Sequence, residues 1–132
     1  MLHRFILFFG IISLTFSCGK EESRECSGIC TEEFRSITVE ITDTQRNPVI
    51  LDSTNITDIT NDRHLDLNSE VFEDGFYTIF NDNFISEYKN KELSLLFRGF
   101  QDEELIVEET YKVGADCCHV YYISGPLEIV LE

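Results

Sequence analysis

Four cysteines carry most of the chemistry in this sequence, because their spacing allows either disulfides or a metal site. Cys26 and Cys30 are separated by three residues, whereas Cys117 and Cys118 are adjacent and are followed directly by His119. Thiolate sulfur together with imidazole nitrogen is a ligand set that zinc and copper accept. The spacing disfavours such a site, since zinc knuckles use Cys-x-x-Cys and two adjacent cysteines do not easily point at one ion.

Disulfides between the two pairs are the preferred alternative. A bond between Cys117 and Cys118 would need a strained ring, because neighbouring side chains in an extended chain point apart. We therefore expect two bonds that join Cys26 and Cys30 to Cys117 and Cys118, with the connectivity open. The first bond would close a loop of about 90 residues and contribute up to ~4.5 kcal/mol in the chain-entropy model. A nucleophile pair of Cys118 and His119 lacks an identifiable orienting group and oxyanion donor.

The N-terminal segment has the organisation of a secretion signal. A short basic start over residues 1–4 precedes an almost wholly apolar run over residues 5–16, and small residues flank Cys18. The apolar run is about half the ~20 residues that cross a bilayer, which favours a signal over an anchor. Secretion leads to an oxidising compartment, which favours the two disulfides and leaves Cys18 as the odd cysteine.

Residues 13–18 resemble the lipobox of bacterial lipoproteins, in which the signal is cut before a cysteine that carries the lipid. The next charged residues, Lys20, Glu21 and Glu22, resemble the short export signal of Bacteroidota-type surface lipoproteins. The resemblance implies that the mature chain begins at an acylated Cys18, with palmitate among its acyl groups. It also implies an outer-membrane protein that is lipid-anchored and exposed at the cell surface.

The charge of the chain excludes several partners. It has 25 acidic and 10 basic residues and a formal net charge of −15. Such a chain would be repelled by nucleic acid, and it has no polybasic surface for anionic lipids, so membrane attachment must come from the acyl chains. We expect a signal peptide over residues 1–17, a lipidated flexible tether over 18–29 and a single domain over 30–132.

The expected domain is all-β. In residues 34–43 apolar and polar residues alternate, which places Ile37, Val39 and Ile41 on one face of a half-buried strand. Residues 52–68 are expected to be mainly loop, residues 84–91 are either a helical turn or irregular, and Gly99 suggests a bulge. The other strands are expected at 49–51, 76–80, 92–100, 105–113, 117–124 and 127–131, with a weak one near 56–59. About seven strands at this spacing predict an antiparallel β-sandwich, Ig-like or transthyretin-like.

One resemblance concerns this fold. Residues 37–43, 47–49 and 74–78 resemble the opening half of transthyretin-like, carboxypeptidase-regulatory-like sandwiches. In that family an alternating strand precedes a turn ending in Pro-Val, and a strand with Gly-x-Tyr follows. Arg46 stands at the turn position that is glycine in the family. Such modules bind or space other domains, so the resemblance implies a non-catalytic role and supplies no catalytic residue.

Other residues are weaker candidates for sites. The acidic pairs 103–104 and 108–109 have the composition of an acid/base set but are expected at the solvated surface. The series Asp52, Asp58, Asp62 and Asp66 lacks the glycine and the fixed spacing of a calcium loop. Residues 52–54 resemble the short O-glycosylation sequon of the same bacterial phylum, with Ser53 as acceptor. The five tyrosines offer a stacking surface for sugars, although alternation places about half of them in the core.

These features together predict a non-catalytic surface module that binds a protein partner or glycan, or serves as an accessory subunit. No cofactor is expected. The alternative is a metal- or thiol-site protein that uses the four paired cysteines and His119. An enzyme would instead need His119 and carboxylates gathered in a cleft, with perturbed pKa values.

Overall fold

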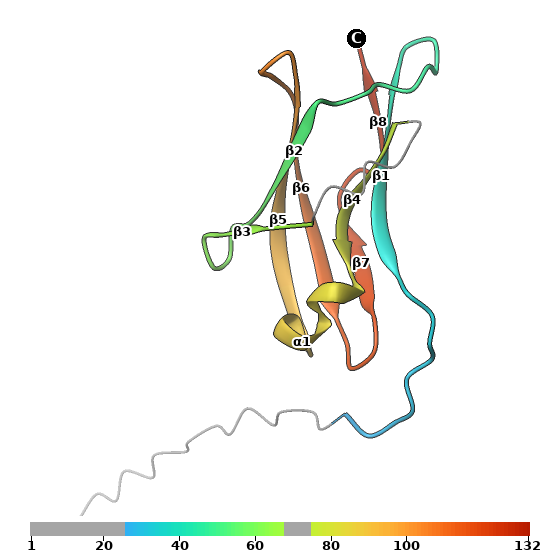
Figure 1. Ribbon diagram of the computed structural model, residues 1–132, viewed down its shortest axis with the longest axis vertical. Coiled ribbons are helices and arrows are strands. Elements are labelled where there is room, and N and C mark those ends of the chain that lie inside the picture. Colours follow the sequence, from blue (N-terminus) through green and yellow to red (C-terminus); the bar gives the residue numbers. More distant parts are fainter. Residues whose placement is uncertain (1–25, 68–74) are drawn as a thin grey trace, which may run out of the picture.

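The computed structural model describes residues 26–67 and 75–132 (Figure 1). The predicted signal, Cys18 and the export signal at Lys20, Glu21 and Glu22 lie outside the described residues. Within the described part the chain forms eight strands, one 3₁₀ turn and one short helix. In chain order these are β1 (Ser36–Asp43), β2 (Ser53–Asp58), β3 (Arg63–Leu65), β4 (Phe76–Asn81), η2 (Asp82–Phe84), α1 (Ile85–Tyr88), β5 (Lys91–Gln101), β6 (Glu104–Ala115), β7 (Val120–Ser124) and β8 (Glu128–Leu131).

The strands form two sheets that face each other, and this sandwich-like arrangement confirms the predicted fold class (Figure 1). The smaller sheet has the order β4-β1-β8, and the larger has the order β3-β2-β5-β6-β7. All pairings between these strands are antiparallel except one, since β8 runs parallel to β1. The final strand therefore ends at the same end of the sandwich as β1.

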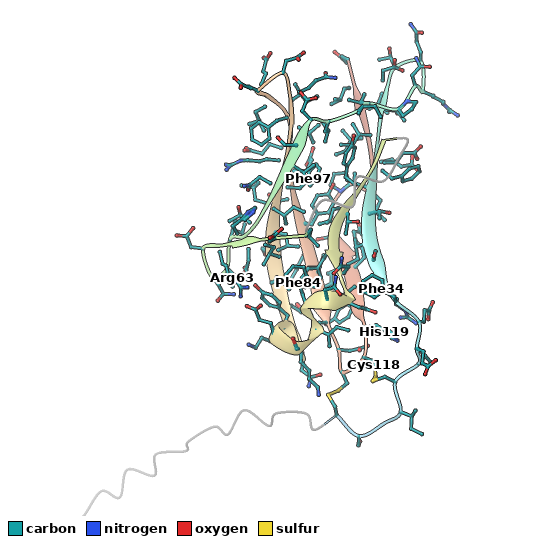
Figure 2. All side chains as sticks on the ribbon, viewed as in Figure 1. Phe34, Arg63, Phe84, Phe97, Cys118 and His119 are labelled. Atoms are coloured by element: carbon teal, nitrogen blue, oxygen red, sulfur yellow. A yellow bond between two sulfur atoms is a disulfide. The ribbon has the colours of Figure 1, made fainter. Side chains whose placement is uncertain are left out.

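The core lies between the sheets and follows the alternation of the sequence. Ile37, Val39 and Ile41 are all buried, as the pattern predicts. On the facing sheet Phe97 is fully buried and meets Tyr111 edge-on, with 6.4 Å between the ring centroids. Figure 2 shows Phe97 in the space between the two layers. Burying side chains of this size contributes about 1.5–3 kcal/mol each.

The strand predicted at 49–51 is wrong, and the segment after it contains more strand than predicted. Residues 49–51 do not form a strand; the hydroxyl of Tyr77 donates to Val49 O at 2.8 Å and accepts from Leu51 N at 2.7 Å. A buried phenol thus replaces the hydrogen bonds that a neighbouring strand would supply. The weak strand predicted near 56–59 is present as β2, which begins earlier, and β3 follows in the segment predicted to be mainly loop. Pairing of β2 with the long β5 outweighs the polar composition of this segment.

Arg46 adopts the backbone conformation that glycine favours, with φ of 65°. Asp43 holds this turn, because its carboxylate accepts from Gln45 N and Asn47 N, both at 2.8 Å, and from the Asn47 amide at 2.8 Å. These hydrogen bonds offset the cost of the left-handed conformation in a residue with a side chain. The turn therefore forms with an arginine at that position.

The undecided segment after β4 is a helical turn. The Asn81 side chain accepts from Asn83 N at the start of η2, and α1 follows directly. Phe80, Phe84 and Tyr88 pack around each other here, with ring centroids 5.5–6.5 Å apart. Phe84 lies at the end of the sandwich where the described chain enters (Figure 2). Next to it in the chain, Asp82 contacts His119 and Val120 at the β6–β7 connection.

Candidate functional site at the disulfide-clamped end

Two disulfides join the N-terminal segment to the β6–β7 connection. They link Cys26 to Cys117 and Cys30 to Cys118, with Cα–Cα distances of 5.4 and 5.3 Å. The structure thus contains the cross-links expected between the two pairs, and it resolves their connectivity. All four sulfur atoms are bonded in pairs, so none is present as the free thiolate that a metal site or a cysteine nucleophile requires.

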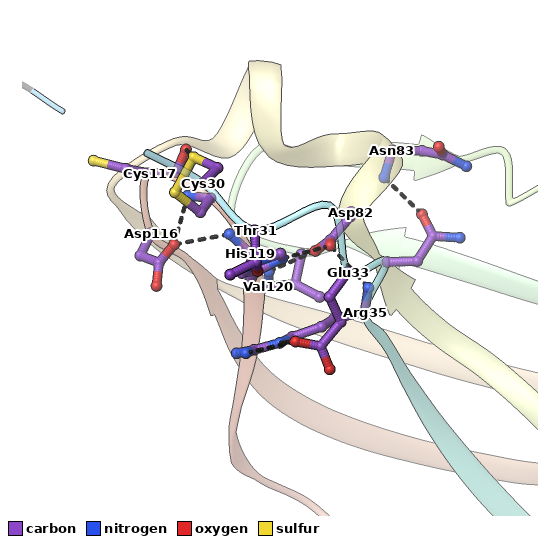
Figure 3. A network of polar contacts seen from close by, with 12 residues as sticks. Cys30, Thr31, Glu33, Arg35, Asp82, Asn83, Asp116, Cys117, His119 and Val120 are labelled. Atoms are coloured by element: carbon purple, nitrogen blue, oxygen red, sulfur yellow. Dashed lines mark hydrogen bonds and ion pairs between the residues drawn. A yellow bond between two sulfur atoms is a disulfide. The ribbon is translucent and has the colours of Figure 1, made fainter. Parts of the chain in front are cut away.

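His119 is a buried residue at the centre of a polar network beside the disulfides (Figure 3). Its Nδ1 is 2.8 Å from Asp82 Oδ2, and its Nε2 is 2.8 Å from Thr31 Oγ1. The side chains of His119 and Asp82 are only 9% and 8% exposed. Because a carboxylate can only accept, Nδ1 carries the proton; in the neutral ring Nε2 then accepts from the Thr31 hydroxyl.

Asp82 connects three segments through one carboxylate. Besides His119, it accepts from Val120 N at 2.8 Å and from Arg35 N at 2.8 Å, while its own N–H donates to Arg35 O at 3.0 Å. Burial alone would raise the pKa of Asp82, but the hydrogen bonds from His119, Val120 and Arg35 outweigh it and hold this pKa below its ordinary value. The carboxylate is thus ionised at neutral pH, and each of its oxygens accepts at least one hydrogen bond.

Asp116 shapes the turn that contains the adjacent cysteines. Its Oδ1 accepts from Cys118 N at 2.7 Å and from His119 N at 2.8 Å, and its N–H donates to His119 O at 2.9 Å. Hydrogen bonds from these two backbone N–H groups lower the pKa of Asp116. This Asx-type turn fixes the backbone that carries Cys117, Cys118 and His119.

The order of groups from Thr31 through His119 to Asp82 is that of a nucleophile, a general base and an orienting carboxylate. A nucleophilic site also needs backbone N–H groups free to stabilise an oxyanion. Four N–H groups near His119 are already bound to carboxylates: those of Arg35, Cys118, His119 and Val120. Two carboxylates so close also oppose a new negative charge. The network is therefore better suited to holding Thr31 and Arg35 in place than to acyl chemistry.

The remaining predicted residues lie elsewhere. Ser53 is exposed at the start of β2, and Glu108 forms an ion pair with Arg98 at 2.7 Å. Asp58 is fully buried and accepts from the hydroxyl of Tyr88 at 3.0 Å and from its own turn, so it is not a solvent-facing calcium ligand. Among the described residues no group of three His, Cys, Asp or Glu side chains is placed to hold a metal ion.

Three residues of this site were not predicted: Thr31, Asp82 and Asp116. A sequence signal existed for Asp116, because an aspartate two and three residues before Cys118 and His119 is typical of an Asx turn. No local pattern marks Asp82, whose partners are 37, 38 and 47 residues away in the chain. Its role depends on the fold that brings these segments together.

Comparison with protein-family models, with curated proteins and with solved structures finds no match. In the described parts of the chain, no helix has the length and apolar character that a membrane span requires. The function must therefore be inferred from the geometry of this chain and from its sequence signals.

Proposed function

We propose that this protein is a non-catalytic, lipid-anchored surface module, in which the two disulfides and the Asp82 network fasten the tether to a rigid β-sandwich. Cys18 carries the lipid, Lys20, Glu21 and Glu22 direct export, and the domain faces outward from the outer membrane. The module binds a protein partner or glycan, or acts as an accessory subunit. Ser53, exposed on β2, is the proposed O-glycosylation acceptor.

The position of the two disulfides is the observation that carries this proposal. One disulfide holds Cys26, near the end of the proposed tether, and the other holds Cys30, the first residue of the proposed domain; both attach to the same end of the sandwich. Figure 1 shows the described N-terminal segment entering at this end, beside α1 and the β6–β7 turn, while the C-terminus lies at the other end. Such a clamp suits a domain that is carried on a lipid anchor.

The two-sheet fold is also consistent with the transthyretin-like resemblance, in which modules bind or space other domains. Arg46 supports it, because this residue takes the left-handed conformation of the family's turn glycine. Fold alone does not define function. The resemblance therefore adds to the proposal but does not carry it.

The anchoring is tested with Cys18→Ala in the native host. We expect the variant to lose incorporation of labelled palmitate and to leave the membrane fraction. A matched variant with Lys20→Ala, Glu21→Ala and Glu22→Ala should keep the label but lose sensitivity to protease added to intact cells. Retention of label and membrane partition by Cys18→Ala would refute the lipid anchor.

Binding is tested by cross-linking on intact cells, followed by recovery of the protein in detergent. The displayed domain should recover the same partner protein or glycan in independent preparations. Repeated recovery of none would favour a pure spacer over a binding module.

A second candidate function is acyl transfer by the Thr31 hydroxyl. The single observation in its favour is the pair of 2.8 Å distances that connect Thr31, His119 and Asp82. The N–H groups already bound to carboxylates argue against acyl transfer. Labelling of Thr31 with a fluorophosphonate probe tests it.

A further inference from the structure

One of the five tyrosines is bonded differently from the others. Four donate their hydroxyl to an oxygen of the chain: Tyr77 to Val49, Tyr88 to Asp58, Tyr111 to Pro126 and Tyr122 to Gly125. Tyr121 forms no hydrogen bond through its hydroxyl within the described residues, and its side chain is 38% exposed. Its hydroxyl is therefore available to a ligand.

The ring of Tyr121 lies flat on the outer face of the larger sheet. Tyr121 pairs across β7 and β6 with Gly114, and a Cβ built on Gly114 would be 2.3 Å from Cζ, 2.5 Å from Oη and 2.7 Å from Cε2 of the ring. Cζ is the nearest of these atoms although the other two are bonded to it, so the point lies above the plane of the ring at its hydroxyl end. One ring face thus covers the glycine, and the opposite face is turned away from the sheet.

Polar groups border the ring on the same face. Glu92 on β5 is the cross-strand partner of Gly114, and its carboxylate forms an ion pair with Lys112 Nζ at 2.8 Å. Both side chains are about half exposed, at 52% and 49%. The next row of the sheet places Ser94 and Ser124 on either side of Lys112, and Ser124 is exposed. The border therefore offers a cation, an anion and hydroxyls.

We propose that this face is a binding site for a neutral glycan, with one hexose ring stacked on Tyr121. The apolar C–H face of a hexose matches the exposed face of an aromatic ring. Its hydroxyls need donors and acceptors around that ring, which Glu92, Lys112 and the Tyr121 hydroxyl supply.

The charges define which glycan fits. The ion pair beside Tyr121 is balanced, while the whole chain carries a net charge of −15. An acidic glycan would be repelled by that field, whereas a neutral one would not. This inference rests on the proposed function as a binding module and names the ligand class and the site.

The experiment is affinity electrophoresis of the detergent-purified protein in native gels that contain one polysaccharide each. The neutral probes are dextran, laminarin, mannan and xyloglucan, and polygalacturonate is the acidic control. We expect retardation by at least one neutral probe and none by polygalacturonate. Tyr121→Ala should weaken that binding by roughly tenfold or more, whereas Tyr121→Phe should retain most of it because the stacking face remains.

Gly114→Ala tests whether the position of the Tyr121 ring matters for binding. Its methyl group would collide with the Tyr121 ring, so the ring must shift and binding should fall although every polar group remains. Tyr122→Ala is the matched control, because Tyr122 is equally exposed on the same strand but is not the tyrosine that covers Gly114. Far-UV circular dichroism of each variant verifies that the sandwich is intact.

The inference is overturned if no neutral probe retards the protein, or if Tyr121→Ala binds as well as the unchanged chain. In that outcome the ring serves only to cover Gly114, a known way to stabilise glycine in a sheet. If cross-linking on cells still recovers a protein partner, the proposed function stands without the glycan site. If cross-linking also recovers no partner, both the glycan site and the proposed function as a binding module fail.

Discussion

The two ends of the sandwich are built in different ways. At the clamped end, the links join residues far apart in sequence: the disulfides span 91 and 88 positions, and Asp82 accepts from Arg35 and Val120. At the opposite end no disulfide is present among the described residues, and the Asp43 side chain bonds only within the turn at 43–47. The turn at 101–104 joins the paired strands β5 and β6, and single hydrogen bonds connect it to Ile50 and Asp52. One end is held by covalent cross-links and a carboxylate that is largely buried, and the other by exposed turns and single hydrogen bonds.

This difference shows where the chain needs reinforcement. A turn between paired strands closes a short loop, and the entropy cost of closing it is small. The N-terminal segment before β1 has no strand partner, so its ordering must be supplied by long-range bonds. The disulfides and the buried Asp82–His119 pair supply them. The comparison predicts that equivalent changes at the two ends differ in their effect on stability.

The largest effect is expected from removing both disulfides. Replacing Cys26, Cys30, Cys117 and Cys118 together by serine should lower the free energy of unfolding by about 4–5 kcal/mol, because the unfolded chain regains the entropy of a long open loop. Urea unfolding followed by far-UV circular dichroism measures this. Replacing only Cys26 and Cys117 should cost much less, since the second bond closes nearly the same loop. A full loss from one pair alone would contradict the entropic explanation.

The next effect is expected from Asp82→Asn. The amide cannot accept from His119, Val120 and Arg35 as the carboxylate does, so at least one buried donor loses its partner, at a cost of about 2–4 kcal/mol. Asp43→Ala is the matched change at the opposite end, where water replaces the lost hydrogen bonds and the loss should be smaller. Equal losses in the two variants would remove the contrast between the ends.

The pH dependence of stability follows from the same carboxylate. Asp82 has a pKa below its ordinary value of 3.8 in the folded protein. Below 3.8 the unfolded chain binds more protons at this site than the folded chain, so stability rises with pH there. Its contribution is complete above the ordinary pKa and is lost as the pH falls through the lower, folded pKa.

Urea unfolding between about pH 2 and pH 6 tests this, with Asp82→Asn as the comparison. Asp43, Asp58 and Asp116 also have lowered pKa values, so the variant should keep part of the acid dependence. The difference in unfolding free energy between the two proteins should be constant above the ordinary pKa and should narrow below it. A constant difference at all pH values would show that Asp82 does not bind these partners as a carboxylate.

The contrast between the ends also explains how far sequence analysis succeeded. Alternation placed Ile37, Val39 and Ile41 in the core, and the predicted bulge at Gly99 is present as a register shift between Gly99 and Phe100. These features depend on local periodicity. The two-sheet sandwich followed from their repetition along the chain.

What sequence analysis missed depends on contacts between distant segments. Residues 49–51, predicted as a strand, are instead bonded to the Tyr77 hydroxyl, 28 residues from Val49. The partners of His119 come from Thr31 and Asp82, 88 and 37 residues away. The cysteines were an exception, because disulfide chemistry limits which long-range pairs can form. His119 was recognised as a candidate, but its neighbours required the fold.

The smallest effect is expected from Thr31→Val, which removes the hydroxyl bonded to His119 Nε2 but keeps the shape of the side chain. If the network only holds the N-terminal segment, the unfolding free energy should fall by about 0.5–1.5 kcal/mol. A fluorophosphonate probe should then label neither protein. The control is Thr110→Val, since Thr110 is also exposed but lies on β6, away from this network. Labelling of the unchanged chain that disappears in Thr31→Val and in His119→Ala, but persists in Thr110→Val, would instead establish Thr31 as a nucleophile. Because the nearby N–H groups are bound to Asp82 and Asp116, we expect the first result: His119 then acts as a structural link between the clamp and the sheet.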